Sequence, residues 1–179
     1  MIVVFCGKQG SGKTTLAKKL KKYNPNFELL KIASPVYELH NIIYDYLYSN
    51  DLVRIKCEKD GDLLQYIGDG FRKMFYPDIW IKFLKDNLKK KDKEINCIID
   101  DCRYLNEFSF LKDLGAFFIR LKCDRNNRKD RATSWRSNEH CDSEIDLDSI
   151  PDEDFDIILN TSILSIDLCA SLIQKKITI

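Results

Sequence analysis

Residues 7–14 read Gly-Lys-Gln-Gly-Ser-Gly-Lys-Thr and directly follow the apolar run Ile-Val-Val-Phe-Cys at residues 2–6. A glycine, four residues and then Gly-Lys-Thr form the phosphate-binding loop pattern. The β-branched run before it predicts a buried parallel strand, and residues 15–20 after it predict the start of a helix. Loop glycines permit a tight turn with inward-pointing N–H groups, and a helix N-terminus attracts anions. The chain is therefore expected to bind a nucleoside triphosphate.

The pattern assigns roles to individual residues of this loop. Lys13 is expected to reach the β- and γ-phosphates, and the hydroxyl of Thr14 to ligate Mg²⁺. The expected cofactors are thus ATP and Mg²⁺. The loop residues expected to bind them are Gly7, Gly10, Ser11, Gly12, Lys13, Thr14 and Thr15.

The bulk composition is that of an ordinary globular domain. The chain has 179 residues, of which 44% are hydrophobic and 32% charged, and a net charge of +1. Such a balance argues against a general nucleic-acid binder, which usually has a clear basic excess. No apolar run approaches the length that crosses a bilayer. Seven cysteines with no C-x-x-C pair indicate buried, reduced thiols and a cytoplasmic location.

Strand and helix patterns alternate along the chain. Strands are predicted at residues 2–6, 27–33, 95–101, 116–121 and 155–160, and further helices at 36–48, 62–74, 79–90, 105–114 and 165–176. Ser34 is expected to cap the helix that begins with Pro35, and Gly115 to end the helix before it. Such alternation predicts a parallel α/β sheet with helices on both faces and ligands at the carboxyl ends of the strands.

Two carboxylates close the third predicted strand. A phosphate-loop enzyme needs an acidic residue there for a second contact to Mg²⁺, direct or through water. Because side chains alternate along a strand, Asp100 and Asp101 cannot both point the same way. One of them is expected to serve the metal while the other caps the following helix.

Residues 124–139 are rich in arginine and have no apolar face. This pattern fits a solvated helix, or a lid that closes guanidinium groups over phosphates. The position between the last two strands favours the lid. Its arginines, with Arg120 just before it, are Arg125, Arg128, Arg131 and Arg136.

Several motifs together resemble the phage and large-virus deoxynucleoside monophosphate kinases, over nearly the whole chain. Beyond the phosphate loop, residues 33–37 resemble the family's Ala-x-Pro segment, and residues 63–72 match its Leu-Leu-Gln-x-x-Gly-x-x-x-Arg stretch. Residues 101–107 match Asp-x-Arg-Phe-x-Asn-Glu. Residues 140–144 resemble His-x-Ser-Glu, with one extra residue after His140.

The resemblance implies a fold and a domain layout. The fold is the three-layer P-loop kinase fold, with a five-stranded parallel sheet in the order 2-3-1-4-5. It implies one domain over residues 1–179, with its core at 1–34, 92–123 and 150–179. The acceptor-binding insert is expected at 35–91 and the lid at 124–149.

The resemblance also implies the reaction: ATP-dependent phosphorylation of a deoxynucleoside 5′-monophosphate. Arg72 and Arg103 are expected to grip the acceptor phosphate, Arg128 and Arg131 to neutralise the transferring group, and Asp101 to hold Mg²⁺ near the acceptor. Other candidates for the acceptor are Ser34, Tyr37, Gln65, Trp80 and Glu144. Tyr37 and Trp80 could equally belong to the hydrophobic core. Glu144 could instead orient another group or cap a helix. Asn160 is expected either beside the adenine of ATP or in a turn.

Alternatives stay open from the sequence. Animal-type phosphomevalonate kinase is similar in the same places, through Glu144 and the Leu-Asp and Phe-Asp pairs at 147–148 and 155–156. A nucleotide sensor without turnover would show damaged metal or lid positions, and a nucleic-acid-end kinase would need a basic channel. The expected partner is a small-molecule acceptor, and no nucleic acid or membrane is expected. A second copy of the chain, forming a homodimer, is a further candidate partner. A viral source would place it in the host cytoplasm.

Overall fold

The computed structural model describes residues 1–55, 57–90, 96–131, 135 and 141–177. They fall into two compact units, the first formed by Met1–Leu30 with Lys91–Ile179 and the second by Lys31–Lys90. The second unit, called the insert below, covers nearly the same residues as the insert expected at 35–91.

The first unit is built on five parallel strands in the order β2-β3-β1-β4-β5, as predicted. Val3 in β1 pairs with Ile98 of β3 on one side and with Phe117 of β4 on the other, so β1 lies at the centre. Since all strands are parallel, their carboxyl ends meet at one edge of the sheet. The strands are β1 Ile2–Cys6, β2 Glu28–Leu30, β3 Cys97–Ile99, β4 Phe117–Lys122 and β5 Ile157–Asn160.

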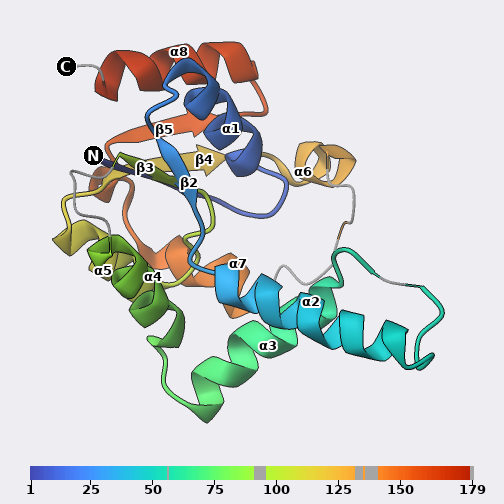
Figure 1. Ribbon diagram of the computed structural model, residues 1–179. Coiled ribbons are helices and arrows are strands. Elements are labelled where there is room, and N and C mark those ends of the chain that lie inside the picture. The colour runs from blue at the N-terminus through green and yellow to red at the C-terminus, as the bar shows by residue number, and fades with distance from the viewer. Residues whose placement is uncertain (56, 91–95, 132–134, 136–140, 178–179) are drawn as a thin grey trace. The chain divides into compact units, whose positions relative to one another are not determined.

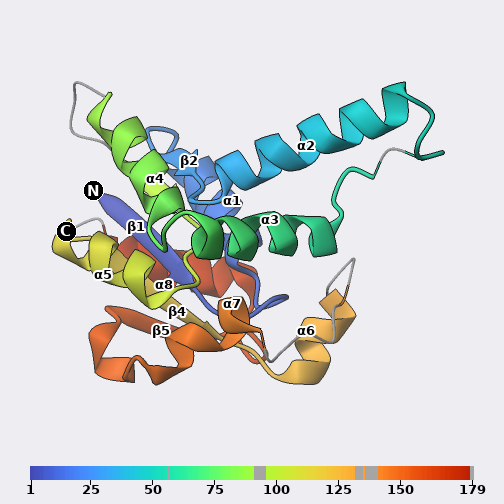
Figure 2. The ribbon, with the colours of Figure 1, turned by 90° about the horizontal axis from the view of Figure 1, so that it is seen from below.

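Helices cover both faces of this sheet, which confirms the predicted three layers (Figure 1). Leu16 and Leu20 of α1 and Ile173 of α8 bury against alternate strand residues, including Phe5. On the other face, Phe108 of α5 packs on Phe118, with ring centroids 4.1 Å apart. Figure 2, seen from below, shows α5 in front of the sheet and α8 behind it. The helices are α1 Lys13–Tyr23, α5 Leu105–Asp113, α6 Arg125–Arg131, α7 Asp142–Ile145 and α8 Ile166–Ile177, with 3-10 turns η1 Asp146–Ser149 and η2 Asp152–Asp154.

Three strands are shorter than predicted. β2 pairs only with β3, in the register Glu28 to Cys97 and Leu30 to Ile99, so both have three residues instead of the seven expected at 27–33 and 95–101; residue 95 lies outside the described part. β5 begins two residues late, because Asp156 serves another purpose. Its carboxylate accepts the Phe118 N–H at 2.7 Å, and its own N–H donates to the Phe118 carbonyl at 3.0 Å.

Both predicted helix caps at the N-termini were wrong. Helix α2 begins at Ser34 itself, and the Ser34 hydroxyl donates to the Lys31 carbonyl instead of capping. Helix α5 begins after Tyr104, not at Asp100 or Asp101. The Glu107 carboxylate accepts the N–H groups of Arg103 (2.8 Å) and Tyr104 (3.2 Å), and this reach back from the first turn does the capping.

The predicted end of α5 is confirmed. Gly115 adopts φ +70°, where a side chain would be strained. Its N–H donates to the Lys112 carbonyl at 2.9 Å, and that of Ala116 donates to the Leu111 carbonyl at 3.1 Å. This pair of hydrogen bonds, together with a residue in the left-handed conformation, is a common way for a helix to end.

The insert consists of three helices, α2 Ser34–Ser49, α3 Gly61–Met74 and α4 Ile79–Lys89. Trp80 is buried; its ring stacks on Phe71 at 5.8 Å and its indole N–H donates to the Gly68 carbonyl at 3.0 Å.

No helix of the described residues is long and apolar enough to cross a membrane.

Tyr44→Phe is expected to weaken the insert at neutral pH but not in acid. The Tyr44 hydroxyl donates to Asp60 at 2.6 Å, and this bond, followed by those from the Leu63 and Asp62 amides, lowers the pKa of Asp60. The interactions that lower the pKa of Asp60 stabilise the fold fully at pH values above the ordinary carboxyl pKa of about 3.9. This stabilisation is lost as the pH falls through the pKa of Asp60 in the folded protein. Hydrogen exchange of the α3 amides should therefore accelerate in the variant at about pH 7, with a difference that shrinks steadily toward acid.

Tyr48→Phe is the matched control, since Tyr48 is an exposed tyrosine on the same helix. It should leave the α3 amides unchanged at every pH. An undiminished effect of Tyr44→Phe in acid would show that the tyrosine acts by packing rather than through the carboxylate.

Candidate functional site

The phosphate loop connects β1 to α1, in the strand-loop-helix context that the sequence predicted. Gly10 has φ +76°, and a Cβ atom there would lie 2.5 Å from the carbonyl oxygen of Arg128. At Gly7 (φ +145°) a Cβ would lie 2.6 Å from the carbonyl oxygen of Leu121. The loop thus packs against β4 and α6 so closely that glycine is required at both positions.

Lys13 lies folded over this loop. Its ammonium donates to the carbonyls of Gly7 at 2.5 Å and Lys8 at 2.9 Å, and the residue is buried. Burial, and next the positive charge of Arg103, lower the pKa of Lys13 to about 7; Glu144, Cys6 and Asp100 oppose the shift. A bound phosphate would give the ammonium a negatively charged partner and would thereby raise the pKa of Lys13.

Binding of ATP at about pH 8 is expected to take up close to one proton, since the lysine is mostly neutral when free and charged when bound to phosphate. At about pH 6 this uptake should nearly vanish, because the lysine is already protonated. Calorimetry in buffers of different ionisation enthalpy measures the number. Lys13→Arg is the matched control, since arginine stays charged throughout. Equal uptake by both proteins at about pH 8 would contradict the assignment of the proton to Lys13.

Arg103 and Glu144 meet beside the loop. They form an ion pair, and the same arginine donates to the Ser143 carbonyl at 3.2 Å. The other carboxylate oxygen of Glu144 accepts the backbone N–H of Gln9 at 2.8 Å. The structure thus brings together an arginine from the segment after β3, an acid from α7 and the phosphate loop. His140, predicted in the same motif, lies outside the described residues.

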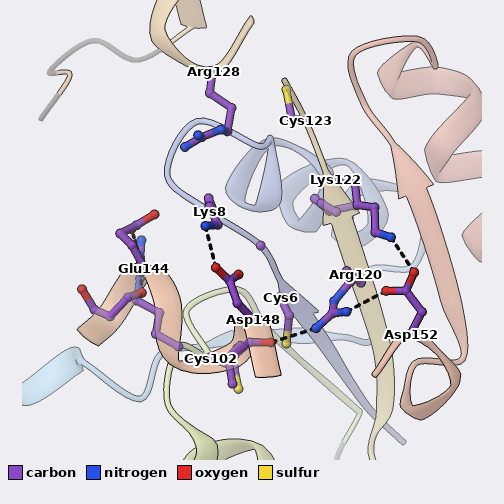
Figure 3. A pocket seen from close by; sticks show the side chains of 15 residues that line it. Cys6, Lys8, Cys102, Arg120, Lys122, Cys123, Arg128, Glu144, Asp148 and Asp152 are labelled. Atoms are coloured by element: carbon purple, nitrogen blue, oxygen red, sulfur yellow. Dashed lines mark hydrogen bonds and ion pairs between the residues drawn. The ribbon is translucent and has the colours of Figure 1, made fainter. Parts of the chain in front are cut away.

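A cavity of about 310 Å³ opens next to these residues (Figure 3). Its walls are the carboxyl ends of β1 and β4, the residues after β3, and parts of α6 and of segment 143–152. Lys8 pairs with Asp148 at 2.7 Å across it. On β4, Arg120 and Lys122 both pair with Asp152, at 2.6 and 2.5 Å. Asp148 belongs to the Leu-Asp pair noted at 147–148, whereas Lys8 and Asp152 were given no role of their own from the sequence. The partners of all three are distant along the chain. The lining cations are Lys8, Arg103, Arg120, Lys122 and Arg128.

The two arginines expected from the lid have different surroundings. Arg128 is buried, donates to the Gln9 carbonyl at 3.3 Å, and lies 5.4 Å from the centroid of the Trp135 ring. Arg131 instead donates to the Thr161 carbonyl at 2.9 Å. Arg128 therefore reaches the phosphate loop, whereas Arg131 holds the turn after β5. Arg136 lies outside the described residues.

That turn also explains Asn160. Its side-chain oxygen accepts the Ser162 N–H at 2.9 Å, which is the turn role. The neighbouring Thr161, which the sequence analysis missed, is buried, and its hydroxyl donates to the Ser11 carbonyl at 3.0 Å. Thr161 thus ties β5 to the phosphate loop. A single polar residue after a strand gives no sequence signal for such a tie.

The loop region has features that fit a polyphosphate with Mg²⁺. The Ser11 hydroxyl is buried and finds no hydrogen-bond partner in the described part of the chain. Thr14 is exposed and lies in the first turn of α1. Within the described ranges, no group of three or more His, Cys, Asp or Glu residues could hold an ion by itself. A metal here would therefore depend on phosphate oxygens as well as on Thr14 and an aspartate.

Asp100 and Asp101 lie in different environments. Asp100 is buried and acts electrostatically on Lys13, while Asp101 is half-buried. Ile98 belongs to the core under α1. Asp100 directly follows the last residue of β3, and the alternation of the strand, continued by this one residue, predicts that its side chain faces the side where α1 begins.

The remaining predicted residues belong to the insert and are described within it. Tyr37, Gln65 and Arg72 are half-buried, and Arg72 donates to the Pro77 carbonyl at 3.0 Å. Trp80 is engaged in the packing given above, which favours its core interpretation over an acceptor contact.

Comparisons with known proteins agree with this architecture. The family described as an AAA domain matches residues 3–152. Among solved structures, shikimate kinase from Aquifex aeolicus is 15% identical with a TM-score of 0.57, over 99% of this chain and 96% of that one. Thymidylate kinase from Candida albicans is 14% identical with a TM-score of 0.58, over 99% and 90%. A sugar kinase from Janibacter sp. is 14% identical with a TM-score of 0.55, over 97% and 92%.

Identities this low speak for the fold alone. A search of curated proteins finds no match. The family match covers most of the chain, and the three fold neighbours match it over 97% or more of its length. The chain belongs to the AAA domain family and has the α/β fold of the P-loop kinases.

Proposed function

We propose that this protein is a phosphotransferase that moves the γ-phosphoryl group of ATP to the phosphate of a deoxynucleoside 5′-monophosphate. One observation carries the proposal: cationic groups from three separate elements converge beside the phosphate loop. They are Lys13 at the start of α1, Arg103 from the segment after β3 and Arg128 from α6. Transfer between two phosphates brings like charges together, so it needs such an excess of positive groups.

The residues of this chain then have distinct tasks. Lys13 and the loop amides hold the donor phosphates, and Arg103 faces the acceptor phosphate. Arg128, fixed on the Gln9 carbonyl, neutralises charge on the transferring group. Bound Mg²⁺ supplies charge neutralisation on the phosphate oxygens, with Thr14 and an aspartate as its protein ligands. Gly7, Gly10 and Gly12 keep the loop backbone close enough to contact phosphate.

The nucleotide acceptor rests on the motif resemblance in residues 63–72 and 33–37. In this proposal Arg72 contacts the acceptor phosphate, while Tyr37 and Gln65 contact its base. Asn160 and Arg131 shape the turn after β5 and act on the nucleotide only through the loop.

The test is ADP release with ATP and Mg²⁺ over a panel of acceptors. It comprises the four deoxynucleoside monophosphates, their ribose counterparts, phosphomevalonate and shikimate. Turnover of a deoxynucleotide that is lost in Arg72→Ala supports the proposal. Turnover of phosphomevalonate or shikimate alone keeps the phosphotransferase but overturns the acceptor class. ATP binding without turnover of any acceptor overturns both.

A further inference from the structure

Glu144 occupies an unusual position for an acid. Its side chain is only 6% exposed, although it lies among groups that the proposed reaction assigns to phosphate. One carboxylate oxygen accepts the Gln9 N–H of the phosphate loop, and the other pairs with Arg103. Its negative charge also raises the pKa of Lys13, against the larger lowering by burial and by Arg103. A buried carboxylate beside phosphate sites repels substrate oxygens, so it needs a different explanation from substrate contact.

The geometry of Arg103 supplies one. Glu107 fixes its backbone by accepting its N–H at 2.8 Å. Glu144 and the Ser143 carbonyl fix its guanidinium at the other end. A guanidinium is a planar fork of five donors, so pairing on one edge sets the direction of the whole plane. The same acid holds the loop, and the relative position of arginine and loop is thereby set by one side chain.

We propose that Glu144 is a positioning residue, which aligns Arg103 with the phosphate loop by bridging the two. The inference rests on the proposed function. Among the roles expected for Glu144, it selects the orienting one, directed at Arg103, over contact with the acceptor and over capping. A long arginine that is held in place before substrate arrives loses less entropy on binding, and this is the benefit that the bridge gives.

Glu144→Gln is the decisive variant. Glutamine keeps the size of the side chain and can still accept the Gln9 N–H, but it carries no charge to pair with Arg103. We expect kcat/KM for the acceptor to fall about 10- to 100-fold, as for other supporting residues. In a protein that already carries Arg103→Ala, the same change should cost almost nothing further, because Glu144 acts through that arginine.

Asp154→Asn is the matched control. Asp154 belongs to the same acidic stretch and pairs with Lys112 on α5, outside the cavity lining. Removing this pair should leave kcat/KM within about twofold. Equal losses from Glu144→Gln with and without Arg103 would overturn the proposal. Tighter ATP binding at unchanged kcat would overturn it as well, because the acid would then be an obstacle rather than a support.

A second measurement does not depend on turnover. In protein labelled with ¹⁵N-arginine, the side-chain signals of Arg103, assigned by their loss in Arg103→Lys, should be those of a held guanidinium. In Glu144→Gln the Arg103 side-chain signals should be averaged, as they are for a guanidinium that rotates freely. If no acceptor reacts but this change occurs, the proposed function fails and the positioning role stands. If the Arg103 signals are the same in both proteins, the positioning role fails.

Discussion

Lys13→Ala is expected to lower kcat for phosphoryl transfer about 10³-fold, at the upper end for a single preorganised charge. The ammonium is held by two loop carbonyls at the centre of the cationic cluster. Alanine leaves no group that could take its place, since the neighbouring Arg103 is bound to Glu144. The measurement is single-turnover ADP formation at saturating ATP, which separates the chemical step from binding.

The variant should not be less stable than the natural protein. Burial lowers the pKa of Lys13 from its ordinary value of 10.5 to about 7. The unliganded fold therefore destabilises the charged ammonium form of this lysine. The unfolded chain binds more protons in this window, and stability rises with pH through it. Removing the lysine removes this cost, and the thermal midpoint at about pH 7 should stay equal or rise.

Lys18→Ala is the control, as an exposed lysine of the same helix. It should change neither rate nor midpoint. A Lys13→Ala protein that retains its rate would mean that the loop does not hold the transferring phosphate. One that loses its rate together with its fold would mean that the lysine is structural.

The fold could be predicted from sequence because its signals are local. An apolar run before a glycine-rich loop, or a glycine after a helix, is decided by neighbouring residues, and β1 and the end of α5 were predicted correctly from such signals. The strand order was implied by the family resemblance, and the structure confirms it. Strand lengths were not predicted correctly, because β2 and β3 end where their mutual pairing ends. That register depends on residues about seventy positions apart, and no local pattern encodes it.

The candidate site shows the same division. The loop and its lysine are contiguous and could be found by their spacing. The tie from Thr161 to Ser11 and the bridge from Glu144 to Gln9 join residues well over a hundred positions apart. Their side chains are ordinary polar ones that acquire their role only when the strand ends converge. The sequence therefore predicts which residues carry charge at the site but not which of them hold the others.

Asp100→Asn should reduce turnover about 100-fold, whereas Asp101→Asn should remain within about twofold. The motif resemblance, which begins at Asp101, favours that residue for the metal. The structure provides two reasons for the neighbour. Asp100 is buried and acts on Lys13 electrostatically, and strand alternation from Ile98 directs it toward the start of α1, where Thr14 lies.

The two variants make a matched pair, since each replaces one carboxylate by an amide of the same size. A titration of activity with Mg²⁺ distinguishes their roles: the Asp100 variant should need far more metal, and the Asp101 variant should follow the natural curve. Asp100→Asn should also lower the pKa of Lys13 further, because the carboxylate raises it. Proton uptake on ATP binding should then begin at lower pH. If Asp101→Asn is the one that shifts the Mg²⁺ titration, the motif-based assignment is right and the argument from strand alternation is wrong.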